Sequence, residues 1–97
     1  MVKTMDNIDE FMNRRRVELA GRTSVLLREL AINLNIETIE RELHRITGTC
    51  GSYGLVDGSR GAADLLARIR GEPIGRLAGE LNALADVFDR SSVNGGS

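Results

Sequence analysis

Residues 36–54 read IETIERELHRITGTCGSYG, and this stretch carries the clearest structural pattern in the chain. Its apolar side chains recur at alternating intervals of three and four residues, at Ile36, Ile39, Leu43, Ile46 and Cys50. That spacing is typical of a helix that buries one face in a bundle. We therefore predict a helix that begins after Asn35, whose side chain suits an N-cap, and extends to about Tyr53, with Gly54 as the C-cap.

Two segments downstream show the same kind of spacing. A second seam of alternating intervals runs from Ile74 to Phe88. Pro73 precedes it, where a missing N–H is tolerated at the first position of a helix. Between the two seams, residues 57–70 carry apolar side chains at helical spacing, and Asp57 is a candidate N-cap.

The N-terminal third adds apolar stripes at residues 6–20 and 22–34, and Gly21 between them predicts a break or a bend. The apolar residues do not alternate as they would in half-buried strands. The predicted fold class is all-α: an antiparallel (up-down) four-helix bundle with an additional N-terminal helix or a bent first helix. We expect one domain over residues 1–90 and a flexible C-terminal tail over residues 91–97.

Composition restricts the chemistry that this chain can perform. Thirteen Lys and Arg residues balance 14 Asp and Glu among 97 residues, which argues against nucleic-acid binding. No apolar run approaches the ~20 residues that a membrane-spanning helix needs, so we expect no membrane insertion. A single Cys and a single His exclude an internal disulfide, a multi-thiolate site and a multi-histidine metal site. We therefore predict no metal site, and any chemistry must depend on very few groups.

The single histidine, His44, lies beside the seam, one residue after Leu43. Along the helix surface its neighbours are Glu40, Arg41, Thr47 and Gly48, and Gly51 extends the same line. Each Gly inside a helix costs about 1 kcal/mol relative to Ala, so these glycines require a reason. Three explanations stay open: the helix ends near Gly48, the glycines permit close helix packing, or the missing side chains give another protein access to His44.

The segment from Leu43 to Gly54 resembles the core motif of histidine-containing phosphotransfer (HPt) domains. That motif has an apolar residue, His, any residue, Leu, Lys, Gly, two small residues and a later aromatic–Gly pair. The correspondence places His44 at the phosphoacceptor position. It also places Ile46 at the Leu, Gly48 at the glycine, Thr49 and Cys50 at the small residues, and Tyr53 and Gly54 at the aromatic–Gly pair. The resemblance covers most of the chain, weakly at the N-terminus.

The sequence departs from this motif at Thr47, where the family commonly has Lys. A threonine hydroxyl can donate one hydrogen bond but carries no charge. Charge stabilisation of a phosphohistidine would then come from Arg41, one turn back on the same face, or from the long side chain of Arg45. The docking face that the resemblance implies consists of Glu40, Thr47, Gly48 and Gly51.

The resemblance implies a phosphoryl carrier in a two-component phosphorelay. His44 would accept a phosphoryl group from the phosphoaspartate of a response-regulator receiver domain and pass it to another receiver. The expected partners are receiver domains and a hybrid sensor histidine kinase, with Mg²⁺ in the partner receiver and no intrinsic cofactor. The chain has no Walker-type loop and no kinase glycine-rich loop, so we expect no autonomous kinase activity. We also expect a cytoplasmic monomer.

Two alternatives stay open. The first is a helical adaptor that binds receiver domains or kinases without phosphotransfer, which Thr47 keeps open because it brings no charge to His44. The second is the dimerisation and phosphoacceptor domain of a sensor kinase, which also presents a His on a bundle helix. That domain has the pattern His-Glu/Asp-x-x-Thr/Asn. The sequence does not match it, because Arg45 replaces the acidic residue and Gly48 stands where Thr or Asn should be.

Overall fold

The computed structural model describes residues 2–94, and the side chains within residues 9–92. This part of the chain contains four α-helices, one short 3₁₀ helix and no β-strand. The elements are α1 (Val2–Asn33), α2 (Ile36–Ser52), α3 (Val56–Arg68), the 3₁₀ helix η1 (Ile69–Gly71) and α4 (Ile74–Asn94). The all-α class predicted from the apolar spacing is confirmed.

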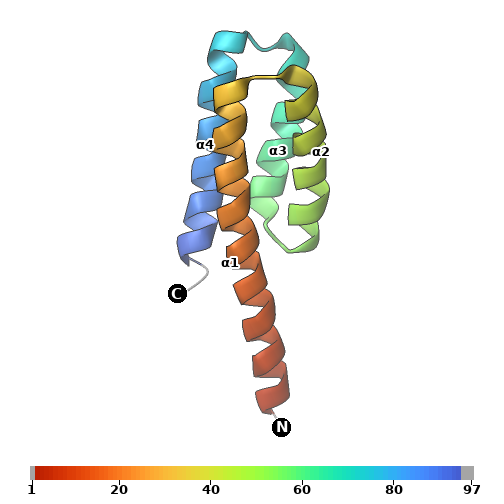
Figure 1. Ribbon diagram of the computed structural model, residues 1–97. Coiled ribbons are helices and arrows are strands. Elements are labelled where there is room, and N and C mark those ends of the chain that lie inside the picture. The colour runs from red at the N-terminus through yellow and green to blue at the C-terminus, as the bar shows by residue number, and fades with distance from the viewer. Residues whose placement is uncertain (1, 95–97) are drawn as a thin grey trace.

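The helices pack in two pairs, with α1 along α4 and α2 along α3. Figure 1 shows the α1–α2 and α3–α4 connections at one end of the molecule and the α2–α3 turn at the other. The N-terminal part of α1 projects past the α2–α3 turn, so the molecule is elongated, with extents of 54 × 20 × 16 Å. The bundle therefore leaves part of its longest helix without a neighbouring helix.

One apolar core joins all four helices. Its fully buried large side chains include Leu27 from α1, Ile39 and Leu43 from α2, and Leu77, Leu81 and Phe88 from α4. Burial of each such side chain contributes about 1.5–3 kcal/mol. Helix α3 approaches the Phe88 ring of α4 closely at Gly58, where an added Cβ would lie 2.3 Å from that ring. Glycine is required there because any larger residue would displace a buried aromatic side chain.

The predicted limits of the helix that carries His44 are confirmed within one residue. Asn35 is the N-cap of α2, and its Oδ1 accepts a hydrogen bond from the backbone N–H of Thr38 at 3.0 Å. The helix ends at Ser52 with Tyr53 as its C-cap, one residue before the predicted C-cap Gly54. Gly54 adopts a φ of +80°, in the left-handed region that glycine tolerates best. The local capping chemistry was therefore sufficient to define both ends of this element.

The break predicted at Gly21 is wrong, because α1 is continuous from Val2 to Asn33. Ala20, Thr23 and Ser24 are buried around Gly21, and a Cβ on Gly21 would lie 3.6 Å from the Ser92 Oγ of α4. Packing against α4 thus holds this part of α1 helical and outweighs the cost of one glycine, about 1 kcal/mol. The two predicted N-terminal segments form one helix.

Three predicted boundaries in the second half of the chain also need correction. Helix α3 begins at Val56, so Asp57 lies in its first turn instead of capping it. It ends at Arg68, two residues before the predicted end, and η1 follows. Pro73 is not the first residue of the last helix, as predicted, but precedes it, because α4 begins at Ile74. The carbonyl of Pro73 accepts a hydrogen bond from the backbone N–H of Leu77 at 3.2 Å.

Helix α4 continues to Asn94, so the tail predicted from residue 91 is wrong over residues 91–94. The Ser91 hydroxyl donates to the carbonyl of Val87 at 3.3 Å, and Ser92 faces Gly21 of α1. The long helix α1 therefore provides a packing partner for the last turns of α4. Residues 95–97 of the predicted tail lie outside the described residues.

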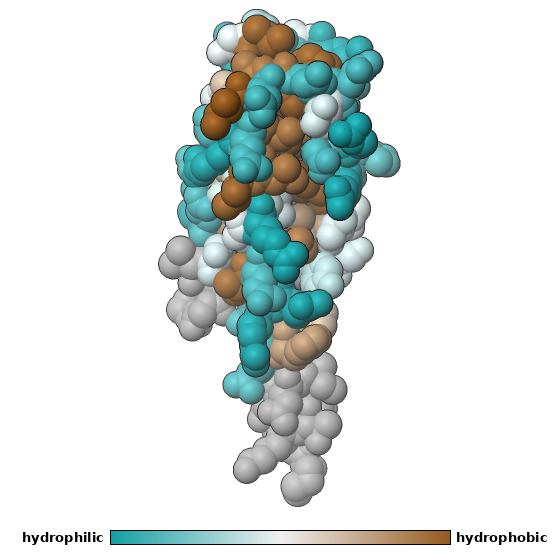
Figure 2. All heavy atoms as spheres, in the orientation of Figure 1, coloured by the Kyte–Doolittle hydropathy of each residue, from teal (hydrophilic) through white to brown (hydrophobic). Residues whose placement is uncertain are grey.

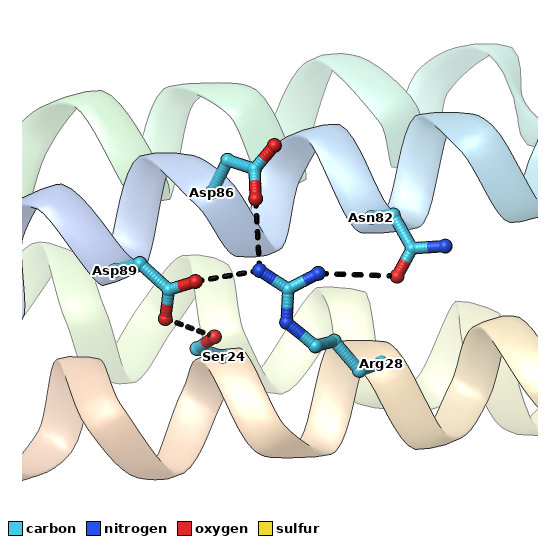
Figure 3. Close-up of polar contacts among 5 residues, drawn as sticks. All are labelled: Ser24, Arg28, Asn82, Asp86 and Asp89. Carbon is cyan, nitrogen blue, oxygen red and sulfur yellow. Dashed lines mark hydrogen bonds and ion pairs between the residues drawn. The ribbon is translucent and has the colours of Figure 1, made fainter.

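A polar cluster joins α1 to α4 beside the core (Figure 3). The guanidinium of Arg28 donates to Asp86 at 2.8 Å and to Asn82 at 3.4 Å, and it also donates to Asp89. The buried Ser24 hydroxyl donates to the other carboxylate oxygen of Asp89. The Ser24 hydrogen bond, followed by the Arg28 interaction, lowers the pKa of Asp89 below its usual range.

Substitution of Gly58 by Ala tests the α3–α4 approach. Gly58→Ala should lower the free energy of unfolding by about 1–3 kcal/mol, because the new methyl group overlaps the buried Phe88 ring. Gly79→Ala on α4 is the matched control, since nothing lies within 4 Å of the Cβ it would add. The control should leave stability unchanged or raise it by up to about 1 kcal/mol in urea unfolding. Equal stability of the two variants would contradict the close approach.

The lowered pKa of Asp89 predicts an acid-sensitive contribution to stability. An aspartate in the unfolded chain titrates near pH ~3.9, so Asp89 stabilises the fold above that pH. This contribution is lost as the pH falls through the lower pKa of the folded state. Asp89→Asn should therefore lose less stability than the wild type between neutral and acidic pH, measured by thermal unfolding. Glu29→Gln, an exposed substitution on α1, should follow the wild type; a parallel decline in all three proteins would contradict the prediction.

Candidate functional site: the exposed face of α2

The imidazole of His44 lies on the solvent-exposed side of α2. The adjacent Leu43 and the nearby Ile46 are buried, which fixes the rotation of the helix about its axis. Consecutive residues on a helix differ by about 100°, so His44 is directed away from the core while its backbone remains anchored. Within the described part of the chain, the His44 side chain makes no hydrogen bond or ion pair. A partner can therefore reach the ring without breaking an internal contact.

Gly48, one turn after His44, faces open space. A Cβ built on Gly48 meets no atom within 4 Å, and the residue lies inside α2, four positions before its end. The explanation that the helix ends near Gly48 is therefore wrong, and so is close packing at this position. The geometry favours the third explanation, in which the absent side chain leaves space beside His44.

Gly51 has a different environment, although it follows His44 on the same line. A Cβ on Gly51 would lie 3.2 Å from the Ser59 Oγ of α3. The Ser59 hydroxyl donates to the carbonyl of Thr47 at 2.8 Å, which brings the two helices together at this level. Gly51 therefore serves the packing of α2 against α3, and only Gly48 leaves open space next to the histidine.

Thr47 lies on the side of α2 that faces α3 and is half-buried. Its hydroxyl donates to the carbonyl of Leu43 at 2.8 Å, one turn back along the same helix. This bond uses the only hydrogen that the side chain can donate. Thr47 is therefore placed to support the backbone of α2, and its hydroxyl is not free to donate to a group on His44.

The two arginines next to His44 differ in their contacts. Arg41 is exposed and has no ion pair or hydrogen bond within the described residues. Arg45 is exposed as well, but it lies 3.4 Å from the carboxylate of Glu42. Exposed pairs of this kind are weak, about 0–1 kcal/mol, so Arg45 can still be drawn away. Together they place positive charge beside the imidazole.

The carboxylate of Glu40, one turn before His44, forms an ion pair with a residue outside α2. Its carboxylate accepts a hydrogen bond at 2.7 Å from Arg70, which lies in η1. The pair connects α2 to the segment after α3 and neutralises the only acidic side chain one turn before the histidine. Of the four predicted docking residues, Gly48 is fully open, whereas Glu40, Thr47 and Gly51 also contact the α3 side of the molecule.

A groove of about 270 Å³ lies on the opposite side of α2, between α2 and α1. Its apolar lining includes Leu19 and Leu26 of α1 and Ile46 of α2, and Arg45 and Glu42 also line it. Figure 2 shows apolar surface between the polar faces of these helices. Cys50 lines the groove but is almost fully buried, and this burial raises the pKa of its thiol, so it remains protonated and unreactive at neutral pH.

Sequence reasoning missed one positioning residue, Arg16, the last of three consecutive arginines at positions 14–16. The Nε of Arg16 donates to the carbonyl of Tyr53 at 2.8 Å, and its guanidinium lies beside Gly54. A cation at the end of a helix satisfies free carbonyl groups and interacts well with the helix dipole. Arg16 thus fixes the α2–α3 turn to α1. The available signal was its position one turn before the buried Ala20.

Neither a metal-binding cluster nor a membrane-spanning helix is found among the described residues. No three side chains of His, Cys, Asp or Glu lie close enough together to hold a metal ion there. Among the helices described, none combines the length and apolar character that a membrane crossing requires. The candidate site is therefore defined by one accessible imidazole, two arginines and an open glycine position.

Comparison with known proteins does not assign this chain to a family. The chain matches no protein-family model, no curated protein and no solved structure. Its function must therefore be inferred from the geometry of the α2 face and from the motif that contains His44.

Proposed function

We propose that this protein is a histidine phosphotransfer carrier that exchanges phosphoryl groups between receiver domains through His44. The observation that carries the proposal is the exposed imidazole with no internal partner, next to the open position at Gly48. The HPt-like motif from Leu43 to Gly54 adds support from the sequence. The proposal includes an up-down order of the four helices, with α1 as a lengthened first helix, and a cytoplasmic location.

The proposed chemistry requires little of this chain. A lone pair on a neutral imidazole nitrogen of His44 attacks the phosphorus of a receiver's phosphoaspartate. The new N–P bond forms as the acyl-phosphate O–P bond breaks, and the aspartate leaves as a carboxylate. Transfer to a second receiver reverses this step with another aspartate as the acceptor. Phosphoryl transfer depends mainly on positioning and on neutralisation of charge, so a rigid carrier suffices.

Arg41 is the residue best suited to stabilise the phosphohistidine. It lies one turn before His44, carries a permanent charge and has no competing internal contact among the described residues. Arg45 is a weaker candidate because it lies near Glu42. Mg²⁺ would be held by the receiver domain, and this chain would bring no metal of its own.

A second candidate is an adaptor that binds receivers or a hybrid histidine kinase without accepting phosphate. The observation in its favour is Thr47, which replaces a cationic residue and whose hydroxyl is bonded to Leu43. The adaptor would keep the docking face of α2 but would not be labelled on His44. Phosphotransfer and docking must therefore be measured separately.

Incubation with a phosphorylated receiver domain tests the carrier directly. The wild type should acquire a label that is stable in base and labile in acid, and His44→Gln should acquire none. Gly48→Gln should retain its fold, because the new side chain enters open space, yet lose most of the transfer by obstructing the approach to His44. Receiver binding without label on the wild type would support the adaptor instead, and normal transfer by Gly48→Gln would overturn the access argument.

The roles of the two arginines are separable by substitution. Arg41→Ala should shorten the lifetime of the phosphohistidine and slow the transfer by about threefold to tenfold, through the loss of one charge beside the phosphoryl group. Arg45→Ala is the matched control, one turn further along the same exposed side of α2, and it should have a smaller effect. Rate and lifetime can be measured in one phosphotransfer time course. An unchanged time course for Arg41→Ala would refute its assigned role.

A further inference from the structure

Helix α2 has two flanks beside His44, an outer flank and a flank that faces α3. Because consecutive residues differ by about 100°, Arg41 lies about 60° from His44 around the helix axis, on the outer flank. Thr47 lies about 60° from His44 in the opposite direction, and its carbonyl accepts a hydrogen bond from Ser59 of α3. Glu40, about 40° from His44 and one turn before it, lies on this α3 flank as well.

One cation reaches the α3 flank from outside α2. Arg70 lies in η1, which follows α3 at the end of the bundle where α2 begins (Figure 1), and its guanidinium donates to Glu40 at 2.7 Å. This bond uses one terminal nitrogen, and the guanidinium makes no other hydrogen bond or ion pair among the described residues. The Arg70 side chain is 73% exposed, and exposed pairs of this kind are weak. Most of its five N–H donors are therefore free for another acceptor.

The α3 surface between Ser59 and Arg70 does not obstruct this flank. Ala63 and Ala67 are exposed and lie four and eight residues after Ser59, so they continue its line along the helix. Neither has a side chain larger than a methyl group. Arg68 is directed elsewhere, because it pairs with a carboxylate of α4. The first long side chain that follows Ser59 on this line is therefore Arg70.

We propose that Arg70 is a phosphoryl-binding residue of the His44 site and supplies the charge that Thr47 does not bring. The inference rests on the proposed function, because it concerns the phosphorylated form of His44. In the free protein, Glu40 holds the guanidinium beside a position one turn, or about 6 Å, from His44 along the helix. A phosphoryl group on the imidazole places negatively charged oxygens near the free nitrogens of Arg70. The guanidinium then bridges Glu40 and the phosphoryl group.

Arg70 and Arg41 would approach the phosphoryl group from opposite flanks of α2. A guanidinium there should prolong the lifetime of the phosphohistidine for two reasons. It forms charge-assisted hydrogen bonds with the phosphoryl oxygens. It also opposes protonation of the free ring nitrogen, since like charges disfavour one another. That protonation allows the imidazole to leave as a neutral group in hydrolysis, when the N–P bond breaks and a water oxygen bonds to phosphorus to give inorganic phosphate.

Chemical phosphorylation of the full chain with phosphoramidate tests the proposal without a receiver domain. The imidazole nitrogen attacks phosphorus, and the P–N bond of phosphoramidate breaks with the release of ammonia. Because His44 is the single histidine, an acid-labile and base-stable label reports on this residue alone. Arg70→Ala should shorten the lifetime of the label by about threefold to tenfold, and Arg70→Lys should restore part of it. Arg60→Ala, which removes an exposed arginine at the other end of α3, should match the wild type.

Substitution of Glu40 separates direct contact from an indirect effect. If Arg70 only neutralised Glu40, Arg70→Ala would have no effect once Glu40 is replaced by Gln. Direct contact predicts that the label on Arg70→Ala/Glu40→Gln decays about threefold or more faster than the label on Glu40→Gln. Circular dichroism checks that each variant retains its helical content.

Equal lifetimes for Arg70→Ala and the wild type, or for the double variant and Glu40→Gln, would overturn the proposal. Failure of phosphorylated receivers to label the wild type would overturn the carrier function alone, because the measurement with phosphoramidate needs no receiver.

Discussion

The burial of one seam of α2 is the constraint on which the rest of the site depends. Leu43, Ile46 and Cys50 all enter the core, and they fix the rotation of the helix about its axis. Rotation of α2 by one residue would expose this seam and bury charged side chains, at a cost of several kcal/mol. His44 is exposed because it is adjacent in sequence to a residue that must be buried. The accessibility of the imidazole is thus a consequence of core packing.

The two sides of α2 contribute differently to the molecule. Toward α3, hydrogen bonds from Ser59 to Thr47 and from Arg70 to Glu40 hold the helix in place. Toward α1, the helices separate and leave the apolar groove. A face that presents a nucleophile benefits from this asymmetry, because the α3 side supplies rigidity while the outer side remains free for a partner.

Helix α1 is the longest helix described, and only part of it packs in the bundle. Its C-terminal half packs against α4 through buried apolar residues and through the polar cluster of Ser24 and Arg28 with Asp89. A second cluster, in which Arg68 contacts Glu72 and Glu80, connects α3 to α4 in a similar way. The N-terminal part of α1 projects past the α2–α3 turn (Figure 1).

The sequence by itself determined the helical class, the limits of α2 and the exposure of His44, because these follow from local spacing and from capping by Asn35 and Gly54. Only the tertiary structure decided that Gly21 lies within a continuous helix, since the neighbouring α4 outweighs a local preference for a break. It also separated two glycines that are equivalent in the sequence: Gly48 faces open space, and Gly51 faces Ser59. Local signals record what a residue favours in isolation, whereas the environment of each glycine depends on a helix that is distant in the chain.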